Sequence, residues 1–448
     1  MSMSAITTFG TEPRALAGAY RRLRERSRVL FDLLSEDTYY SRPIDLRHPI
    51  VFYEGHLPAF SFNTLVKRAL GQRGIDARLE QLFARGIDPS ETEGPRQDGR
   101  GAWPSRAEVQ AFADEADRQV LEALDRSDLD RPGHPLLDHA EAAFAILEHE
   151  AMHQETLLYM WHQLPHDQKR RPTGYAPQVE GDAPREEWAD IPGGRVTLGV
   201  DRGSIQFGWD NEFPSSRVDV APFVIARHDV TNEQFLEFVH AGGYTDPRWW
   251  RAADWDWLMR AGQRHPLFWA QRGGEWYWRG MFEWIPMPRA WPVYVSHAEA
   301  SAFARWRAAR LPTESEFQRA AFGTERGDER VHPWGDAEPS PQRGMFDFAS
   351  WDPAPAGSHP AGRSAFGVDD LVGNGWEWTS TVFAPFPGFR AMASYPEYSA
   401  DFFDGEHFVM KGASPATARE LLRPSFRNWF RPHYPYVYAT FRLATDAA

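Results

Sequence analysis

The chain has 448 residues, no cysteine and a formal net charge of −14, from 49 lysines and arginines against 63 aspartates and glutamates. The lack of cysteine excludes disulfides, thiolate metal sites, iron–sulfur clusters and thiol nucleophiles. The acidic balance disfavours nucleic acids and anionic membrane surfaces as partners, because both are bound through basic patches.

Length and hydropathy set the broad class of the protein. At roughly 100–200 residues per domain, the chain is long enough for two or three domains. It has no run of about 18 apolar residues, and its first residues lack a basic stretch followed by an apolar one. A cytoplasmic protein without a membrane span is therefore expected.

Residues up to about Leu164 show helical periodicity, and Ser105 with Glu108 forms a capping-box pattern ahead of one apolar run. The predicted helices run from Ala15 to Leu34, from Ile50 to Leu70 with an interruption near Pro58, from Ser105 to Leu124, and from Asp138 to Leu164. Four helices joined by longer loops predict a four-helix bundle over residues 1–175. The polar stretch from Gly86 to Pro104 is either a flexible excursion or part of a substrate mouth.

Residues after Trp188 have a different pattern, in which short apolar runs alternate with Gly, Pro and Asn turns. Pro165–Pro184 reads as the linker before them. The predicted strands are Arg195–Gly199, Phe223–Ala226 and Trp276–Arg279, and the predicted helices are Thr231–Ala241, with Thr231 as N-cap, and Ser296–Arg307. The chain is thus expected to be an α+β protein whose second domain covers residues 186–448.

The strongest local signal for chemistry is His149-Glu150-Ala151-Met152-His153. Two histidines at i and i+4 lie on one face of a helix, so both rings can reach the same metal ion. The HExxH pattern is also that of zinc peptidases, in which the glutamate is a general base. Two unrelated histidines on a long helix would give the same pattern.

A third ligand must come from another helix, and His56 is well placed to face an i, i+4 pair across a bundle. Taken alone, His56 is more readily explained as a core histidine. His139 is the best substitute, and the remaining candidates are His48, His134 and His162. Three neutral imidazoles leave open positions on an octahedral ion, which suits an iron that must bind both a substrate and dioxygen. Glu54 and Glu150 are either acceptors that orient the imidazole N–H groups or solvent-facing charges.

The second half contains three characteristic segments: Arg310–Phe317, Gly373–Thr379 and Ala439–Leu443. Together they resemble the formylglycine-generating-enzyme-like (sulfatase-modifying) domain, a variant of the C-type lectin fold. The activity that gives this domain its name depends on cysteine chemistry, which a chain without cysteine cannot perform.

The first half resembles a DinB-like bundle with one metal histidine on one helix and an HExxH-type pair on another. This pairing of domains, together with the stretch Arg423–Trp429, resembles the sulfoxide synthases of ergothioneine and ovothiol biosynthesis and the similar selenoneine synthases. The resemblance covers nearly the whole chain. It implies a non-haem iron(II) held by His56, His149 and His153. It also implies that hercynine, a trimethylated histidine, receives sulfur or selenium from a thiol or selenol donor on its imidazole carbon, with dioxygen as the oxidant.

The resemblance also implies roles for residues of the second half. Asn428 and Trp429 match part of the hercynine pocket, where Trp429 would be a cation–π wall for the quaternary ammonium. Tyr395 and Tyr398 match a pair of active-site tyrosines, one of which would donate a proton or a hydrogen bond. Packing in the core is the other explanation for these aromatic side chains.

Two positions depart from the ergothioneine pattern. Phe430 stands where several ergothioneine enzymes have an acidic residue, and Met152 stands where glutamine is common. An apolar Phe430 fits a less charged donor, such as a selenium-bearing sugar, which favours selenoneine synthase. The alternatives are an ergothioneine-type hercynine sulfoxide synthase that uses cysteine or gamma-glutamylcysteine, a zinc hydrolase built on the HExxH motif, and a non-catalytic binding protein.

Overall fold

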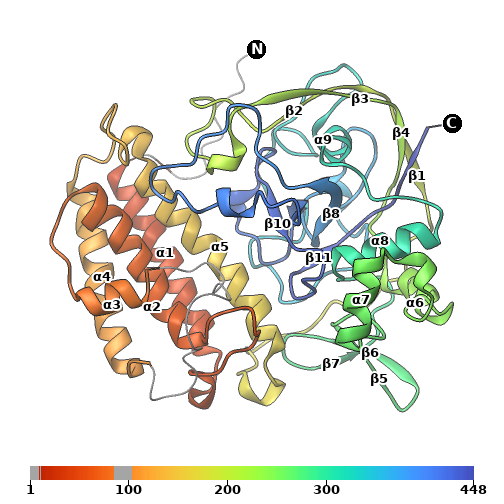
Figure 1. The fold of residues 1–448 in the computed structure, drawn as a ribbon, viewed down its shortest axis with the longest axis horizontal. Helices are drawn as coiled ribbons and strands as arrows, with labels where there is room; N and C mark the ends of the chain where they lie inside the picture. Colours follow the sequence, from red (N-terminus) through yellow and green to blue (C-terminus); the bar gives the residue numbers. More distant parts are fainter. Residues whose placement is uncertain (1–9, 11, 85–102, 448) are drawn as a thin grey trace. The chain divides into compact units, whose positions relative to one another are not determined.

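The computed structural model describes residue 10, residues 12–84 and residues 103–447, which form two compact units (Figure 1). Of the described residues, the helical unit comprises those from 10 to 175 together with Ala393–Tyr395, and the mixed unit comprises Ala176–Met392 and those from Pro396 onward. None of the helices in the described ranges is long and apolar enough to cross a lipid bilayer. Most of the stretch expected to be an excursion or a substrate mouth, residues 85–102, lies outside the described residues.

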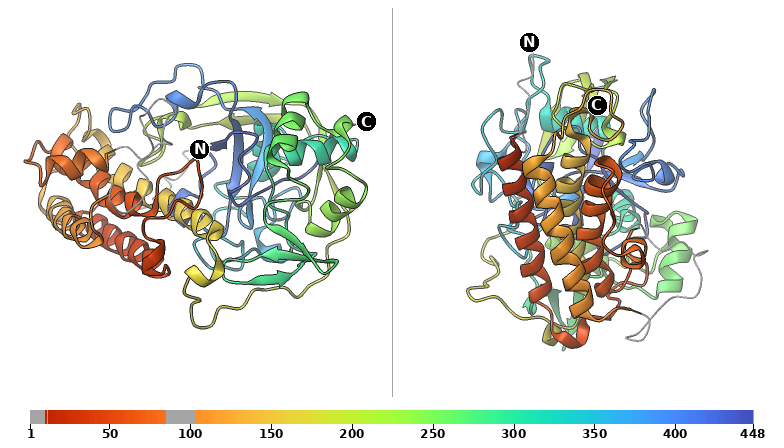
Figure 2. Two further views of the ribbon diagram at one scale, coloured as in Figure 1. Left: turned by 60° about the horizontal axis from the view of Figure 1, so that its bottom comes forward. Right: turned by 90° about the vertical axis from the view of Figure 1, so that its left-hand side faces the viewer.

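Four long helices form the core of the helical unit, and Figure 2 shows them side by side. Helix α1 contacts α4 and α5, and helix α2 also contacts α4 and α5, so each helix packs on two neighbours. The predicted four-helix bundle is therefore confirmed. The four helices are α1 (Pro13–Asp32), α2 (Ile50–Ser61), α4 (Arg106–Arg126) and α5 (Glu141–Gln163), and the shorter α3 covers Ala77–Leu82.

The predicted interruption of the second helix at Pro58 is wrong. Helix α2 runs through Pro58 to Ser61 and continues directly into a π-helix, η2 (Phe62–Ala69). Proline lacks a backbone N–H, so it removes one bond from the helical ladder without ending the helix here. The irregular winding follows Pro58 by one turn, as expected where a helix must absorb such a defect.

The fourth helix begins later than predicted, at Glu141 instead of Asp138. His139 and Ala140 have φ values of 53° and 55°, which lie in the left-handed region and stop the helix from extending backward. The predicted N-cap of the third helix is confirmed, because the Ser105 side chain accepts a hydrogen bond from the Glu108 backbone N–H.

The mixed unit contains four small sheets and four helices in its described residues. The predicted strand Phe223–Ala226 is β4 with the same bounds. The predicted strand Arg195–Gly199 is shifted back by one residue, and the predicted strand Trp276–Arg279 begins one residue earlier than expected, at Glu275. The sheets are β1–β4–β12 (Trp188–Ile191, Phe223–Ala226, Ala444–Asp446), β2–β3 (Gly194–Leu198, Ser216–Val220), β5–β6–β7 (Trp269–Arg272, Glu275–Arg279, Trp284–Pro286) and β10–β9–β8–β11 (Asn428–Phe430, Phe408–Ala413, Gly375–Val382, Ala439–Thr440).

Capping boxes open three of the helices in the mixed unit. Thr231 caps α6 (Asn232–His240), as the sequence predicts, and Ser296, the first residue of the other predicted helix, caps α8 (His297–Trp306). Two further helices were not predicted: α7 (Ala252–Ala261) and α9 (Glu314–Phe322). Helix α9 begins with a third capping box, between Thr313 and Glu316, so its start was visible in the sequence.

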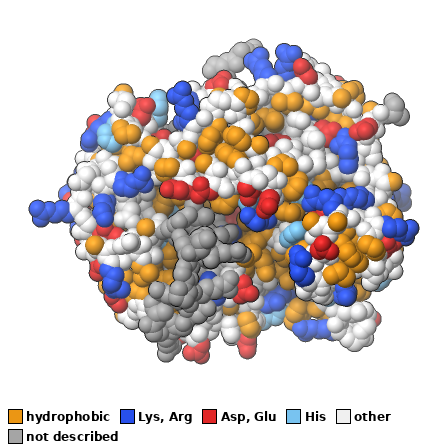
Figure 3. All heavy atoms as spheres, in the orientation of Figure 1, with side chains coloured by type: hydrophobic (Ala, Val, Ile, Leu, Met, Phe, Trp, Pro, Cys, Tyr) orange, Lys and Arg blue, Asp and Glu red, His pale blue; other side chains and the backbone are white. Residues whose placement is uncertain are grey.

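The core of the mixed unit contains charged groups as well as aromatic side chains. Arg442 is fully buried and bonds to the carboxylates of Glu377 and Asp229. Two other buried pairs join Arg423 to Glu212 and Arg427 to Glu314. At the surface drawn in Figure 3, basic and acidic side chains are interspersed among apolar ones.

Candidate metal centre

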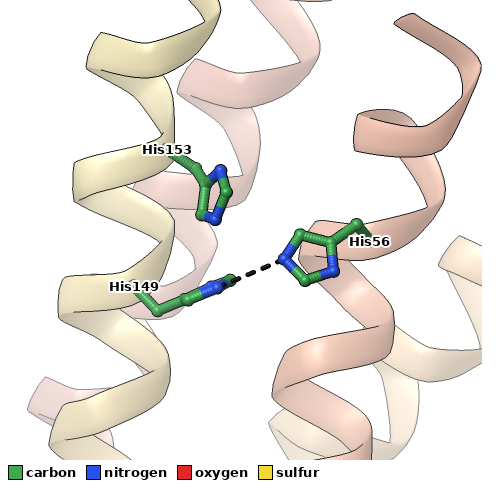
Figure 4. Close-up of side chains that lie close together, drawn as sticks. All are labelled: His56, His149 and His153. Atoms are coloured by element: carbon green, nitrogen blue, oxygen red, sulfur yellow. Dashed lines mark hydrogen bonds between the residues drawn. The ribbon is translucent and has the colours of Figure 1, made fainter. Parts of the chain in front are cut away.

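Three histidines converge inside the helical unit, as Figure 4 shows. His149 and His153 lie one turn apart on α5, and His56 faces them from α2. One ring nitrogen of each histidine lies within 4.8 Å of the others. Among the described residues, no other group of three or more His, Asp or Glu side chains meets this criterion.

The geometry of the three rings suits a shared ion. The Nε2 atoms of His56 and His149 are 3.3 Å apart, and the ring centroids of His149 and His153 are 4.4 Å apart. The His56 ring is 5.0 Å from that of His153. The i, i+4 spacing on α5 supplies two candidate ligands, and the helix contact between α2 and α5 supplies the third.

The orientation of His56 is fixed by a backbone carbonyl. Its Nδ1 lies 2.7 Å from the carbonyl oxygen of Phe83, which requires Nδ1 to carry the proton and leaves a lone pair on Nε2. Phe83 can approach because residue 55 is glycine: a Cβ atom at Gly55 would lie 2.5 Å from the Phe83 ring. The tautomer of a candidate ligand thus depends on a close packing contact.

Aromatic rings enclose the three imidazoles. Phe60 stacks on His149, with ring centroids 3.5 Å apart and an angle of 9° between the planes. Phe52 stacks on His56 at 5.1 Å, and Tyr53 lies 5.9 Å from His153. Phe60 follows His56 by four residues, so the same helical face that presents the ligand also presents the stacking ring.

Burial keeps the three imidazoles neutral. Desolvation lowers the pKa of His56 to about 4 and lowers the pKa values of His149 and His153 well below their ordinary value. Neutral imidazoles offer lone pairs at neutral pH, as metal binding requires. Within the described residues, the buried Nδ1 atoms of His149 and His153 have no hydrogen-bond partner, whereas the Nε2 atom of His149 faces that of His56.

Neither of the two glutamates considered as acceptors for the imidazole N–H groups hydrogen-bonds to a histidine of the cluster, and the expected substitute ligand, His139, lies outside the cluster. Glu150 accepts hydrogen bonds from Arg24 and Ser27, and Glu54 accepts from Arg106. Both carboxylates therefore bind side chains of α1 or α4, and the carbonyl of Phe83 orients His56 instead. His139 is not a substitute ligand, because its left-handed backbone places it before α5 with 78% of its side chain exposed.

Tyr395 belongs to the helical unit and lies beside the histidines. Its ring centroid is 5.3 Å from that of Phe60 and 6.2 Å from that of His149. The sequence resemblance singled out this tyrosine, but nothing in its neighbourhood along the chain predicts contact with α2 and α5.

Most of the other predicted site residues lie together in the mixed unit. Tyr398 stacks on the buried Trp209 at 4.1 Å and meets Trp429 edge-on at 5.3 Å. Trp429 also stacks on Phe383 at 4.2 Å and lies 5.7 Å from Phe402. Trp429, Tyr398, Phe383 and Phe402 are called the aromatic cluster below.

The remaining predicted site residues are neighbours of Trp429 on strand β10 or lie on α5. Asn428 opens strand β10, and its Oδ1 accepts the backbone N–H of Trp429 at 2.9 Å. Phe430 ends the same strand and stacks on Tyr434 at 4.9 Å. Met152 is half-buried on α5, directly before His153.

Asp210 fixes the segment that carries Tyr398. One carboxylate oxygen accepts the backbone N–H of Met392 at 3.3 Å, and the other accepts the hydroxyl of Ser399. Sequence patterns did not single out Asp210 or Trp209, and no local pattern marks either residue. Burial raises the pKa of Asp210 from 3.8 to about 6, although these hydrogen bonds lower it.

The pKa of Asp210 predicts a pH-dependent stability. Because the folded state holds a proton that the unfolded chain releases, this contribution is complete below about pH 4 and is lost as the pH rises through 6. Asp210→Asn, which stays neutral, should therefore gain stability relative to the wild type between pH 4 and pH 7. Urea unfolding at four pH values measures this gain, with the exposed Asp256→Asn as control. A difference that does not change with pH contradicts the assignment.

Comparison with known proteins agrees with this domain order. Residues 176–447 match the model of the sulfatase-modifying factor enzyme 1-like domain, and residues 19–157 match the DinB superfamily. The hercynine oxygenase of Mycolicibacterium smegmatis is 37% identical over 76% of this chain and 78% of its own length. The hercynine oxygenase of Mycobacterium tuberculosis is 42% identical over 56% of this chain, and the match spans 58% of that relative. Ergothioneine biosynthesis protein 1 of Neurospora crassa is 27% identical over 93% of this chain and 56% of its own length.

A DinB-type helical domain followed by a sulfatase-modifying-factor-like domain defines the class of protein. The chain belongs to the family that contains these hercynine oxygenases, which confirms the resemblance to the ergothioneine and ovothiol sulfoxide synthases.

Proposed function

We propose that the protein is a non-haem iron(II), dioxygen-dependent oxidoreductase that joins a chalcogen to the imidazole carbon of hercynine. The observation that carries the proposal is the cluster of His56, His149 and His153, whose ring nitrogens lie within 4.8 Å of one another. The names of the relatives supply the substrate, hercynine, and the reaction class, oxygenation.

The donor set supports iron. Three neutral imidazoles without a carboxylate bind iron, zinc, copper or nickel, and they leave coordination positions open. When bound, iron(II) would supply dioxygen activation and a shared template for hercynine and the donor anion. His56, His149 and His153 would hold it. The rings of Phe60 and Phe52, which stack on His149 and His56, would exclude water from these imidazoles.

The proposed reaction balances as follows. The imidazole C–H bond and the donor S–H or Se–H bond break, and a carbon–chalcogen bond and a chalcogen–oxygen bond form. One atom of dioxygen ends in the product and the other in water, so dioxygen accepts four electrons. Tyr395, whose ring is 6.2 Å from that of His149, would donate a proton or hydrogen bond through its phenol during this step.

Residues of the mixed unit are suited to hercynine. Electron-rich faces of Trp and Tyr attract a quaternary ammonium by cation–π interaction, and the aromatic cluster provides Trp429 and Tyr398 for this purpose. The amide of Asn428 adds a polar group at the start of the same strand, β10. We assign hercynine binding to this cluster.

The proposal has two forms, which differ in whether the chalcogen donor carries sulfur or selenium. The names of the relatives, hercynine oxygenase and ergothioneine biosynthesis protein 1, favour a sulfur donor such as cysteine or gamma-glutamylcysteine. The apolar side chains of Phe430 and Met152 favour a less charged donor, such as a selenosugar, as in selenoneine synthases. The family relationship makes the sulfur form the first to test.

Anaerobic reconstitution with iron(II), followed by dioxygen, tests the function. With hercynine and an equimolar mixture of cysteine, gamma-glutamylcysteine and a selenosugar, mass spectrometry should find one hercynine adduct in large excess. The adduct should incorporate one oxygen atom from ¹⁸O₂ and should be absent without iron. Hercynine that stays unmodified with every donor contradicts the proposed function.

A zinc hydrolase is the main rival, because it would use the same HExxH motif. Its general base would be Glu150, but this carboxylate is fully buried and bonds to Arg24 and Ser27 of α1. A base must reach the water that it activates, so this arrangement favours the oxidative function.

A further inference from the structure

Two charged side chains of the helical unit hold the short segment that carries Tyr395. Arg68 donates from its two terminal nitrogens to the carbonyl oxygens of Ser394 and Ala393, both at 3.0 Å. One oxygen of Glu141 accepts the Ser394 hydroxyl at 2.7 Å and the Ser394 backbone N–H at 3.2 Å. Ser394 is 1% exposed. These four contacts are called the docking clamp below.

The clamp is built on the same two helices as the histidines. Arg68 lies on η2, which continues α2 beyond His56. Glu141 is the first residue of α5, eight residues and about two helical turns before His149. A shift between α2 and α5 would therefore move the histidines and the clamp together.

The clamp acts on the backbone of the segment and on the Ser394 hydroxyl, and not on the phenol of Tyr395. Arg68 binds two successive carbonyls as a fork, which fixes the direction of the chain as well as its distance. Glu141 accepts the backbone N–H of Ser394, so charged side chains bind three backbone groups next to Tyr395. Hydrogen bonds to charged groups are the stronger kind, and the segment has no helix or strand of its own to hold it.

We propose that Arg68 and Glu141 are positioning residues that set Tyr395 against His149 and Phe60. The proposal rests on the proposed function, since it gives the phenol a role in oxygen chemistry. Without the clamp, the phenol would leave its place beside the imidazoles, and dioxygen would be consumed without coupling the donor to hercynine. The metal ligands themselves would be unaffected.

Hydrogen–deuterium exchange on the metal-free protein tests the clamp independently of activity. Arg68→Ala and Glu141→Ala should each speed exchange of the Ser394 amide by about tenfold, the effect of losing one net hydrogen bond. Glu141→Gln keeps an acceptor oxygen and should retain most of the protection. Lys67→Ala is the matched control, because Lys67 precedes Arg68 on η2 and pairs with Glu80 instead. Unchanged exchange in both alanine variants overturns the clamp.

The ratio of product formed to dioxygen consumed tests whether the clamp is needed to couple the donor to hercynine. Tyr395→Phe serves as the reference for a lost phenol. Arg68→Ala and Glu141→Ala should fall to a similar ratio at full iron content, with kcat lowered more than the KM for hercynine is raised, and Arg68→Lys should recover part of the loss. Because Arg68 is exposed, its replacement should leave the bundle folded.

The outcomes separate the clamp from the function. Faster exchange with unchanged coupling overturns the positioning role and leaves the proposed function intact. A wild type that couples no donor to hercynine overturns the proposed function and the catalytic part of the proposal, and exchange then decides whether the clamp docks the segment.

Discussion

Replacing His153 with alanine is expected to abolish metal binding while leaving the protein folded. The three imidazoles are the whole of the candidate donor set, and removing one leaves two ligands on different helices, His56 and His149. In the metal-free state, the His153 ring packs against the rings of Tyr53 and His149, and its Nδ1 has no partner among the described residues. Its loss therefore costs mainly packing contacts, and the free energy of unfolding of the metal-free variant should fall by about 0.5–3 kcal/mol, the ordinary range for one substitution.

Metal analysis and thermal unfolding check this prediction. Iron(II) should raise the Tm of the wild type, because a ligand that binds only the folded state stabilises it, and should leave the Tm of His153→Ala unchanged. His139→Ala is the matched control, since His139 is an exposed histidine near the same helix. A His153→Ala protein that retains iron after desalting removes His153 from the metal site.

Replacing Arg442 with methionine is expected to destabilise the mixed unit more than any surface change. Arg442 is fully buried, and its guanidinium bonds to Glu377 at 2.7 Å, to Asp229 at 3.0 Å and to the Asp369 carbonyl at 3.0 Å. Without it, two buried carboxylates lose their counter-charge, which costs about 3–5 kcal/mol in comparable cases.

The loss in Arg442→Met should grow with pH. Burial raises the pKa values of Glu377 and Asp229 even with the arginine present, and its removal would raise them further. At low pH the carboxylates can accept protons in the folded state, so the loss at pH 5 should be smaller than at pH 8.

Denaturant unfolding followed by tryptophan fluorescence measures this loss of stability in the mixed unit. All but Trp103 and Trp161 of the 19 tryptophans lie in the mixed unit, so the signal reports mainly on that unit. Arg195→Met is the control: Arg195 pairs with Asp219, whose side chain is 77% exposed, and such surface pairs contribute little to stability. Equal losses in the two variants would contradict the importance of the buried cluster.

Local patterns predicted those features of this protein that depend on local geometry. The capping residues Ser105, Thr231 and Ser296 satisfy backbone N–H groups within three residues, so sequence alone locates the starts of those helices. The pairing of His149 with His153 follows from the helical repeat in the same way. The start of α5 could not be predicted, because Asp138, His139 and Ala140 carry no breaker residue and still leave the helical conformation.

Contacts between distant segments were beyond the reach of sequence patterns. The choice of His56 over His139 depends on how α2 packs against α5, and the residues suggested either one. The acceptor for His56 is a backbone carbonyl, which leaves no trace in residue type. The roles of Tyr398, Asn428, Trp429, Phe430 and Met152 come from the family resemblance and stay predictions.

The change of winding between α2 and η2 separates two tasks along a single helix. His56 lies in the regular part, whereas Arg68 lies in the part with i to i+5 bonds. Each residue of the wider π-turn advances by a smaller angle than a residue of an α-helix, so rewinding η2 as an α-helix of the same length would turn Arg68 toward another face, while His56 kept its place. The hold on Tyr395 thus depends on how the helix winds after Pro58, and it can change without any change at the three histidines or at the tyrosine itself.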